Sequence, residues 1–160
     1  DTIRADKGTV DIRNTGAGGT VTLTTAQVSG DIVKIGALGS NGTLTIGSGR
    51  INADTLLQLY ATGSNGSVVF VGNVLLSGGS TKMIAGNTVT VNNGVVVEVA
   101  SPIADIYVPD LNHANYNSGL NGGNGSTSGV FILEGTGGSP SNGANTHFGP
   151  PPPPPFSGGH

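Results

Sequence analysis

The stretch Gly39–Gly47 reads GSNGTLTIG, and altered copies of it stand before and after it in the chain. GAGGTVTL precedes it and GSNGSVVF follows it, and each copy is a glycine followed by a short alternating run. The glycine before each run recurs at spacings of 23 and 24 residues, at Gly19, Gly42 and Gly66. Self-similarity at such a period is typical of solenoid proteins. We therefore expect a ribbon of stacked coils.

The alternating runs fall into three interleaved columns. The first column contains Thr20–Leu23, Thr43–Ile46, Ser67–Phe70 and Thr88–Val91. The second contains Ile3, Val28, Ile51, Val74 and Val96. The third contains Val10–Ile12, Val33–Ile35, Leu57–Leu59, Met83–Ala85 and Ile106–Val108. The three columns predict an all-β fold, a parallel β-helix (β-solenoid) with three faces per coil and four to five coils over residues 1–109. We expect a right-handed coil, because crossovers between parallel strands of one sheet are right-handed.

Alternation predicts which side chains point inward, because successive residues of a strand face opposite sides. In the first column the predicted interior ladder is aliphatic and includes Leu44, Val68 and Val89, while the threonines beside them face out. In the third column the predicted outward ladder contains Asp11, Lys34, Gln58, Ile84 and Tyr107. We expect Asp11 and Lys34 to be able to pair across neighbouring coils.

Asn-Gly dipeptides are predicted to form the corners, because both residues tolerate positive φ. They occur at Asn41-Gly42, Asn65-Gly66 and Asn93-Gly94. Asn41, Asn65 and Asn124 also begin glycosylation sequons, and we interpret the first two as turn residues because they recur with the coil.

The composition limits the function classes. Only 9% of the residues are charged, the net charge is −3, and none of the six Lys and Arg residues follows Lys82, which argues against nucleic-acid binding. No apolar run is long enough for a membrane span. The chain has no cysteine, which excludes disulfides and thiol chemistry. It begins DTIRAD, so we expect a processed mature chain or a piece of a longer one.

Residues 110–160 form a predicted irregular Gly/Asn/Pro-rich tail with one short strand near 130–134. Six prolines, Pro150–Pro155, are expected to form a polyproline II rod that ends at Phe156. We expect the tail to tie subunits together by adding its strand to a neighbour's exposed edge, through Val130, Phe131, Ile132, Leu133 and Phe156. The alternative is a tail that folds onto its own last coil as a cap.

No catalytic, cofactor-binding or metal-binding set is predicted, and we expect the chain not to be an enzyme. Parallel β-helices include polysaccharide-active enzymes, but the nine acidic residues are scattered over corners and faces in our assignment. Asp31 and Asp54 share a corner, with Asp105 near it, and could hold a cation; solvated turn residues are the favoured interpretation. His113, His147 and His160 lie far apart in the tail. An ice-binding threonine array on the first face is a further alternative, although Ser67 and Val69 interrupt it.

The repeats GTVTL, GTLTIG, AGNTVTVNNGVVVEV and LLQLYATGSNGSVVF resemble those of the large secreted β-helix exoproteins of Gram-negative bacteria, of the filamentous-haemagglutinin and autotransporter-passenger type. This resemblance implies secretion and a structural or adhesive role at the cell surface. Because no amphipathic helix covers the first coil, we expect a homopolymer: a subunit of an extracellular filament assembled head to tail. The alternative is a fragment of a longer adhesin, with surface glycans as a candidate partner.

Overall fold

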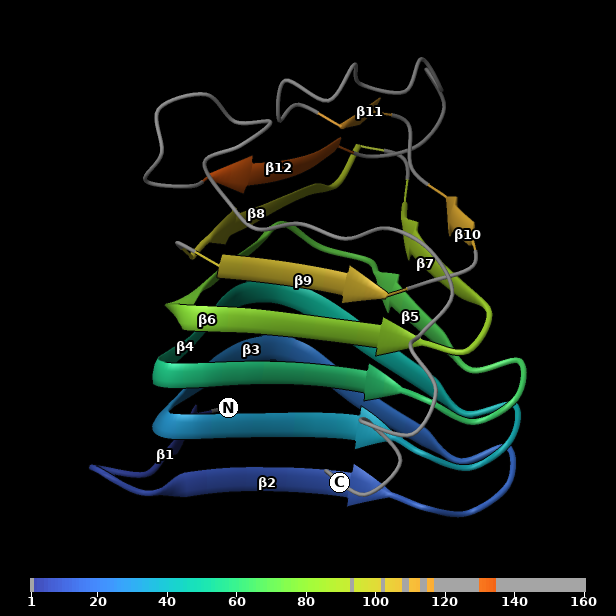
Figure 1. Ribbon diagram of the computed structural model, residues 1–160, viewed down its shortest axis with the longest axis horizontal. Helices are drawn as coiled ribbons and strands as arrows, with labels where there is room; N and C mark the ends of the chain where they lie inside the picture. Colours follow the sequence, from blue (N-terminus) through green and yellow to red (C-terminus); the bar gives the residue numbers. More distant parts are fainter. Residues whose placement is uncertain are drawn as a thin grey trace.

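The fold is known from a computed structural model, which describes residues 2–92, 94–101, 103–107, 110–112, 115–116 and 130–134. Over these ranges the chain is all β and forms a β-solenoid of about four turns. Figure 1 shows strands stacked in layers and coiling upward with a right-handed sense from β1 and β2. In the same ranges there is no helix, and thus none that could cross a membrane. The strands are β1 (Thr2–Arg4), β2 (Thr9–Asn14), β3 (Thr20–Ala37), β4 (Thr43–Ala61), β5 (Ser67–Phe70), β6 (Val74–Ala85), β7 (Thr88–Val91), β8 (Val96–Ala100), β9 (Ile103–Tyr107), β10 (Asp110–Asn112), β11 (Asn115–Tyr116) and β12 (Val130–Glu134).

Each coil has three faces, as predicted, and every strand pairing is parallel. The long strands β3 and β4 turn corners and contribute to all three faces, whereas β6 contributes to two. The first face stacks the start of β3, the start of β4, β5, β7 and β10. The second face stacks β1, the middle of β3, the middle of β4, the start of β6, β8, β12 and β11. The third face stacks β2, the end of β3, the end of β4, the end of β6 and β9.

The interior of the first face is the predicted aliphatic ladder. The register places Leu44 beside Val68 and Val68 beside Val89, and all three side chains are fully buried. Complete burial of such side chains stabilises a fold by about 1.5–3 kcal/mol each. The ladder therefore supplies much of the driving force for stacking.

The predicted register of the second face is wrong in the upper coils, by two residues at Val74 and by three at Val96. Ile51 lies beside Leu76, not beside Val74, and Leu76 lies beside Val99. Val96 is a surface residue at the start of β8. The slip of two residues keeps the Val74 side chain inward, whereas Val96 lies three residues before Val99, and an odd slip turns its side chain outward.

The predicted register of the third face is wrong in the same way. Leu57 lies beside Thr81, and Leu59 lies beside Met83. The outward column that begins with Asp11, Lys34 and Gln58 therefore continues with Lys82 and Asp105. Ile84 and Tyr107, which were predicted in that column, belong to the next one, with Arg13, Gly36 and Tyr60.

The first two Asn-Gly corners are confirmed, and Asn93 of the third lies outside the described residues. Asn41 and Asn65 have φ values of 56° and 59°, in the left-handed region that asparagine tolerates better than other side chains. The Asn65 side chain donates from Nδ2 to Oδ1 of Asn41 one coil below, at 3.2 Å. The two corners are thus aligned by a side-chain ladder as well as by the backbone.

Stacked strands continue beyond Pro109. β10 pairs with β7 on the first face, and β12 pairs with β8 of the same chain on the second. The strand expected near 130–134 is present as β12 and pairs with the chain's own last coil, as in the capping alternative; the addition of this strand to a neighbouring copy stays a prediction. Figure 1 shows β12 and β11 above β8. Phe156 lies outside the described residues.

Candidate functional site

The N-terminal end of the solenoid is an open edge, and we treat it as the candidate site. β1, β2 and Thr20–Leu23 each pair with the coil above, and no strand among those the structure describes lies on their other side. In Figure 1 this edge is at the bottom of the stack. Unpaired backbone N–H and C=O groups on a strand edge form a template for another strand. Here three faces present such a template at once.

Several apolar side chains at this edge are only partly buried. Ile12, Val21 and Leu23 pack against the core but remain partly exposed, whereas Ile35 and Leu44, their neighbours in the next coil, are fully buried. Ile3 is 38% exposed. The edge thus offers both hydrogen-bonding groups and apolar surface in the geometry of one more coil.

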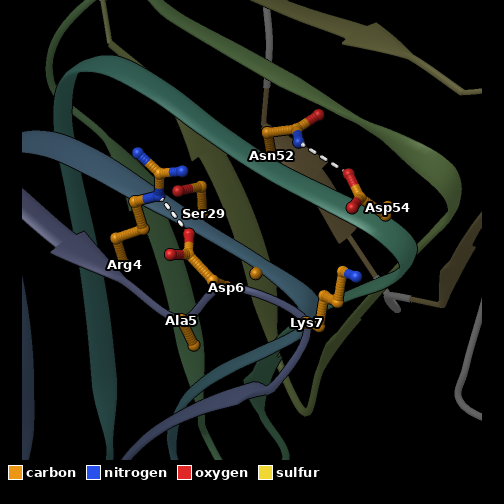
Figure 2. A pocket seen from close by; sticks show the side chains of 8 residues that line it. Arg4, Ala5, Asp6, Lys7, Ser29, Asn52 and Asp54 are labelled. Carbon is orange, nitrogen blue, oxygen red and sulfur yellow. Dashed lines mark hydrogen bonds and ion pairs between the residues drawn. The ribbon is translucent and has the colours of Figure 1, made fainter.

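A hollow of about 550 Å³ opens at the corner between the second and third faces, next to this edge. Figure 2 shows Arg4 and Asp6 directed at each other, and their atoms Nε and Oδ1 are 2.5 Å apart. Both side chains are at least 70% exposed, so the pair contributes little to stability, roughly 0–1 kcal/mol. The charged residues that line this hollow, Arg4, Asp6, Lys7 and Asp54, are all exposed.

The Asp31 and Asp54 corner has its own hydrogen bonds. Thr55 donates from Oγ1 to Oδ1 of Asp31, and Asn52 donates from Nδ2 to Oδ1 of Asp54 at 3.4 Å. The chain bulges here, because the register shifts between Gly30 and Ile32 and again after Ala53. Among the described residues no three acidic or histidine side chains gather as metal ligands. The three histidines of the tail lie outside those residues, as does the side chain of Asp105.

The threonine array on the first face has the expected register. Thr20 lies beside Thr43 and Thr22 beside Thr45, and the next coil contributes Ser67 and Val69. Thr88 resumes the first column and donates from Oγ1 to Oγ of Ser67, at 3.1 Å. The column of outward side chains is thus continuous, but Ser67 and Val69 interrupt the threonines.

The third face has buried outward side chains, which alternation did not predict. Tyr60 is 2% exposed and Ile84 is 1% exposed, although the register places both on the outer side of the wall. Burial, and then the negative charge of Asp11, raises the pKa of Tyr60 to about 12. The predicted outward column contained Ile84 and Tyr107 but not Tyr60, and no sequence pattern indicated that Tyr60 or Ile84 would be buried.

The expected ion pair of Asp11 has a different partner. The register places Asp11 beside Lys34, but its Oδ1 lies 2.8 Å from Nε of Arg13 in the same strand. Of the predicted assembly residues, Val130–Leu133 form most of β12, and their pairing positions on β8 are all that the structure describes.

Comparison with known proteins adds no relative. No protein-family model, no curated protein and no solved structure matches this chain.

Proposed function

We propose that the chain is a structural subunit of an extracellular filament, in which copies stack end to end. The single observation that carries this proposal is the open parallel edge at the N-terminal end, formed by β1, β2 and Thr20–Leu23. A second copy is the partner that best fits such an edge, since its own coils have the same width, the same three faces and the same strand direction.

The opposite end of the solenoid can supply the complementary edge. Within the described ranges β9 pairs only with β6, β10 only with β7, and β11 only with β12. Each of these strands therefore has a second side that could pair with the first coil of another copy. Joining two different ends is a heterologous contact, and it generates an open filament when the rotation does not close.

Apolar burial adds to the backbone pairing. Ile3, Ile12 and Leu23 would become interior residues when a coil is stacked below them. Completing the burial of partly covered side chains of this size contributes on the order of 1 kcal/mol each. The secreted location and the cell-surface role rest on the resemblance to β-helix exoproteins.

The alternative is a fragment of a longer β-helix adhesin, in which further coils cover the same edge. In both arrangements another coil stacks on the open edge. In the filament that coil belongs to a second copy, and in the adhesin it belongs to the same chain. A homopolymer assembles from this chain alone as its concentration rises, whereas in a longer adhesin the coils that cover the edge belong to the same covalent chain.

The test uses two exposed apolar residues in different places. Ile3, on the open edge, is 38% exposed, and Val71, at a corner in the middle of the stack, is 45% exposed. Ile3→Lys should prevent assembly, measured by sedimentation velocity over a range of concentrations, because it places a charge in the contact. Val71→Lys, the matched control, should leave assembly unchanged. Equal effects of the two substitutions, or a native chain that stays monomeric, would contradict the proposal.

A further inference from the structure

The corner between the second and third faces has a different length in successive coils. It is flanked by two outward columns, that of Arg4 and that of Thr9. Between these columns the corner from β1 to β2 contains four residues (5–8), the corner in β3 two (30–31), the corner in β4 three (53–55) and the corner in β6 two (78–79). A short corner thus lies between two longer ones, which must loop further out. The hollow of about 550 Å³ forms over this short corner, with Ser29 and Gly30 as its floor.

The walls of the hollow carry equal numbers of positive and negative side chains. Arg4, Asp6 and Lys7 come from β1 and the corner after it. Asn52 and Asp54 come from β4, and Figure 2 shows all five side chains around the hollow. An anionic ligand would meet the two carboxylates, and a cationic ligand would meet the guanidinium and the ammonium. The hollow therefore favours a ligand without net charge.

Several of these side chains keep hydrogen-bonding groups that no described residue uses. Nε of Arg4 donates to Oδ1 of Asp6, which leaves the two terminal NH₂ groups of Arg4 and Oδ2 of Asp6. Oδ1 of Asn52 accepts from Oγ of Ser77 at 2.8 Å, and Nδ2 of Asn52 donates to Oδ1 of Asp54 at 3.4 Å. These two bonds fix the orientation of the Asn52 amide and leave it one N–H. The hollow thus offers both donors and acceptors in fixed places.

The backbone at Lys7 is strained. Its φ is 63°, in the left-handed region that long side chains rarely adopt, whereas glycine adopts it freely. Figure 2 shows the Lys7 side chain extending along the hollow on the side of Asp54, and its ammonium forms no ion pair with any described residue. Backbone strain of this kind is concentrated at functional sites. The ammonium is therefore available to a ligand.

We propose that this hollow binds a neutral saccharide. Each sugar hydroxyl both donates and accepts a hydrogen bond, and the hollow presents carboxylate acceptors and cationic donors on either side of the Ser29 hydroxyl. Hydrogen bonds to charged groups are stronger than those between neutral groups. Among the residues that line the hollow Ala5 has the only apolar side chain, so an apolar ligand or a peptide with apolar side chains would gain little. The volume lies within the range of about 300–1,000 Å³ that is typical of small-molecule sites.

A second hollow, of about 390 Å³, extends the site along the second face. It shares Ser29 and Asn52 with the first hollow, and its other outward side chains, Thr2, Gln27 and Arg50, are also polar. An oligosaccharide of two or three sugars can therefore lie across both hollows. The site is thus assigned to a short stretch of sugar chain and not to a single sugar.

The first experiment is saturation-transfer NMR on the full chain with neutral trisaccharides of glucose, mannose, galactose and N-acetylglucosamine. Because the site is exposed, we expect weak binding, at millimolar sugar concentrations, to at least one of the four. A sulfated form of the same trisaccharide is the charged comparison and should bind less tightly. Absence of saturation transfer to all four neutral sugars, or tighter binding of the sulfated form, would overturn the proposal.

The second experiment uses two matched carboxylates of the first coil. Asp6 and Asp11 are each paired with an arginine two residues away, but only Asp6 lines the hollow. Asp6→Ala should weaken binding by about tenfold or more, the loss expected for one hydrogen bond to a charged group. Asp11→Ala should leave the affinity unchanged. Equal affinities of the two variants would place the sugar elsewhere and contradict the proposal.

The third experiment separates binding from folding. Lys7→Gly removes the ammonium and also relieves the strained φ, so it should weaken binding while the melting temperature stays the same or rises. A lower melting temperature together with weaker binding would mean that Lys7 serves the fold, and would contradict its role in the site.

This inference does not rest on the proposed filament. Saturation-transfer NMR detects the sugar, and it reads binding to a single chain and to an assembled one alike. A failure of sugar binding leaves the edge-stacking proposal standing, and a failure of assembly leaves the saccharide site standing.

Discussion

Tyr60 lies against Gly36, its neighbour one coil below on the outer side of the third face, so closely that a Cβ on Gly36 would stand 2.9 Å from Cβ of Tyr60. The same added atom would lie 3.2 Å from the Tyr60 carbonyl oxygen. Glycine at position 36 thus leaves room for the base of the Tyr60 side chain. The contact joins two coils through a residue that alternation alone predicts to be exposed.

Gly36→Ala is expected to destabilise the fold by roughly 1–3 kcal/mol, because the new methyl group meets atoms at the base of Tyr60 that cannot move independently of the strand. Gly8→Ala is the matched control. Its Cβ would lie 3.6 Å from Cβ of Ala5, an ordinary contact. Urea unfolding of the two variants measures the difference, and equal free energies of unfolding would contradict the close approach at Gly36.

The stability of the fold should fall at high pH because of Tyr60. Its pKa is raised to about 12 in the folded chain and is about 10 when unfolded, so the folded state holds the phenolic proton more tightly. The stabilisation that comes from this tighter proton binding is fully present below pH 10. It is lost as pH rises from 10 to 12, and the free energy of unfolding falls by roughly 2 kcal/mol. Tyr60→Phe should remove this loss while the lysines titrate as before. Parallel pH profiles for the two proteins in urea unfolding would refute the prediction.

The interior ladder of the first face predicts that a substitution by aspartate lowers stability much more at an inward position than at an outward one. Val68→Asp places a carboxylate between Leu44 and Val89, where no partner is available, and should cost several kcal/mol. Thr45→Asp lies on the outer side of the same face and should change stability by less than about 1 kcal/mol. Thermal unfolding measures both. Similar melting temperatures would mean that the inward and outward assignment is wrong.

A hydrogen bond inside the solenoid predicts a coupled pair of substitutions. Oγ1 of Thr81 and Oγ of Ser101 are 2.7 Å apart, and both residues are 1% exposed. Thr81→Val should cost about 1–3 kcal/mol, because it leaves the Ser101 hydroxyl buried without its partner. Adding Ser101→Ala should restore part of the lost stability. Strictly additive effects in a double-mutant cycle would show that the two hydroxyls act independently.

The same hydroxyl pair explains why part of the register could not be predicted from the sequence. Thr81 occupies an interior position beside Leu57, and its polar side chain made the pattern match Leu57 to Met83 instead. The error is two residues, and a two-residue slip leaves the inward and outward faces unchanged. The three faces, the first-face ladder and the Asn-Gly corners were predictable, because each depends on the identity of local residues.

The burial of Tyr60 and Ile84 on the third face could not be predicted for a different reason. Tyr60 and Ile84 stand at outward positions, and alternation treats every outward position as solvent-exposed. Their burial depends on residues far away in the sequence, which alternation does not take into account.

The central claim, that copies stack end to end through the open edge, is tested most directly by cryo-electron microscopy of the native chain at concentrations where it assembles. We expect filaments in which the strands lie across the axis and in which each subunit adds about four coils, a helical rise of about 20 Å at about 4.8 Å per coil. The density should connect β2 of one copy to the C-terminal end of the next. Particles that remain single solenoids at every concentration, or filaments joined through the side faces, would contradict the account.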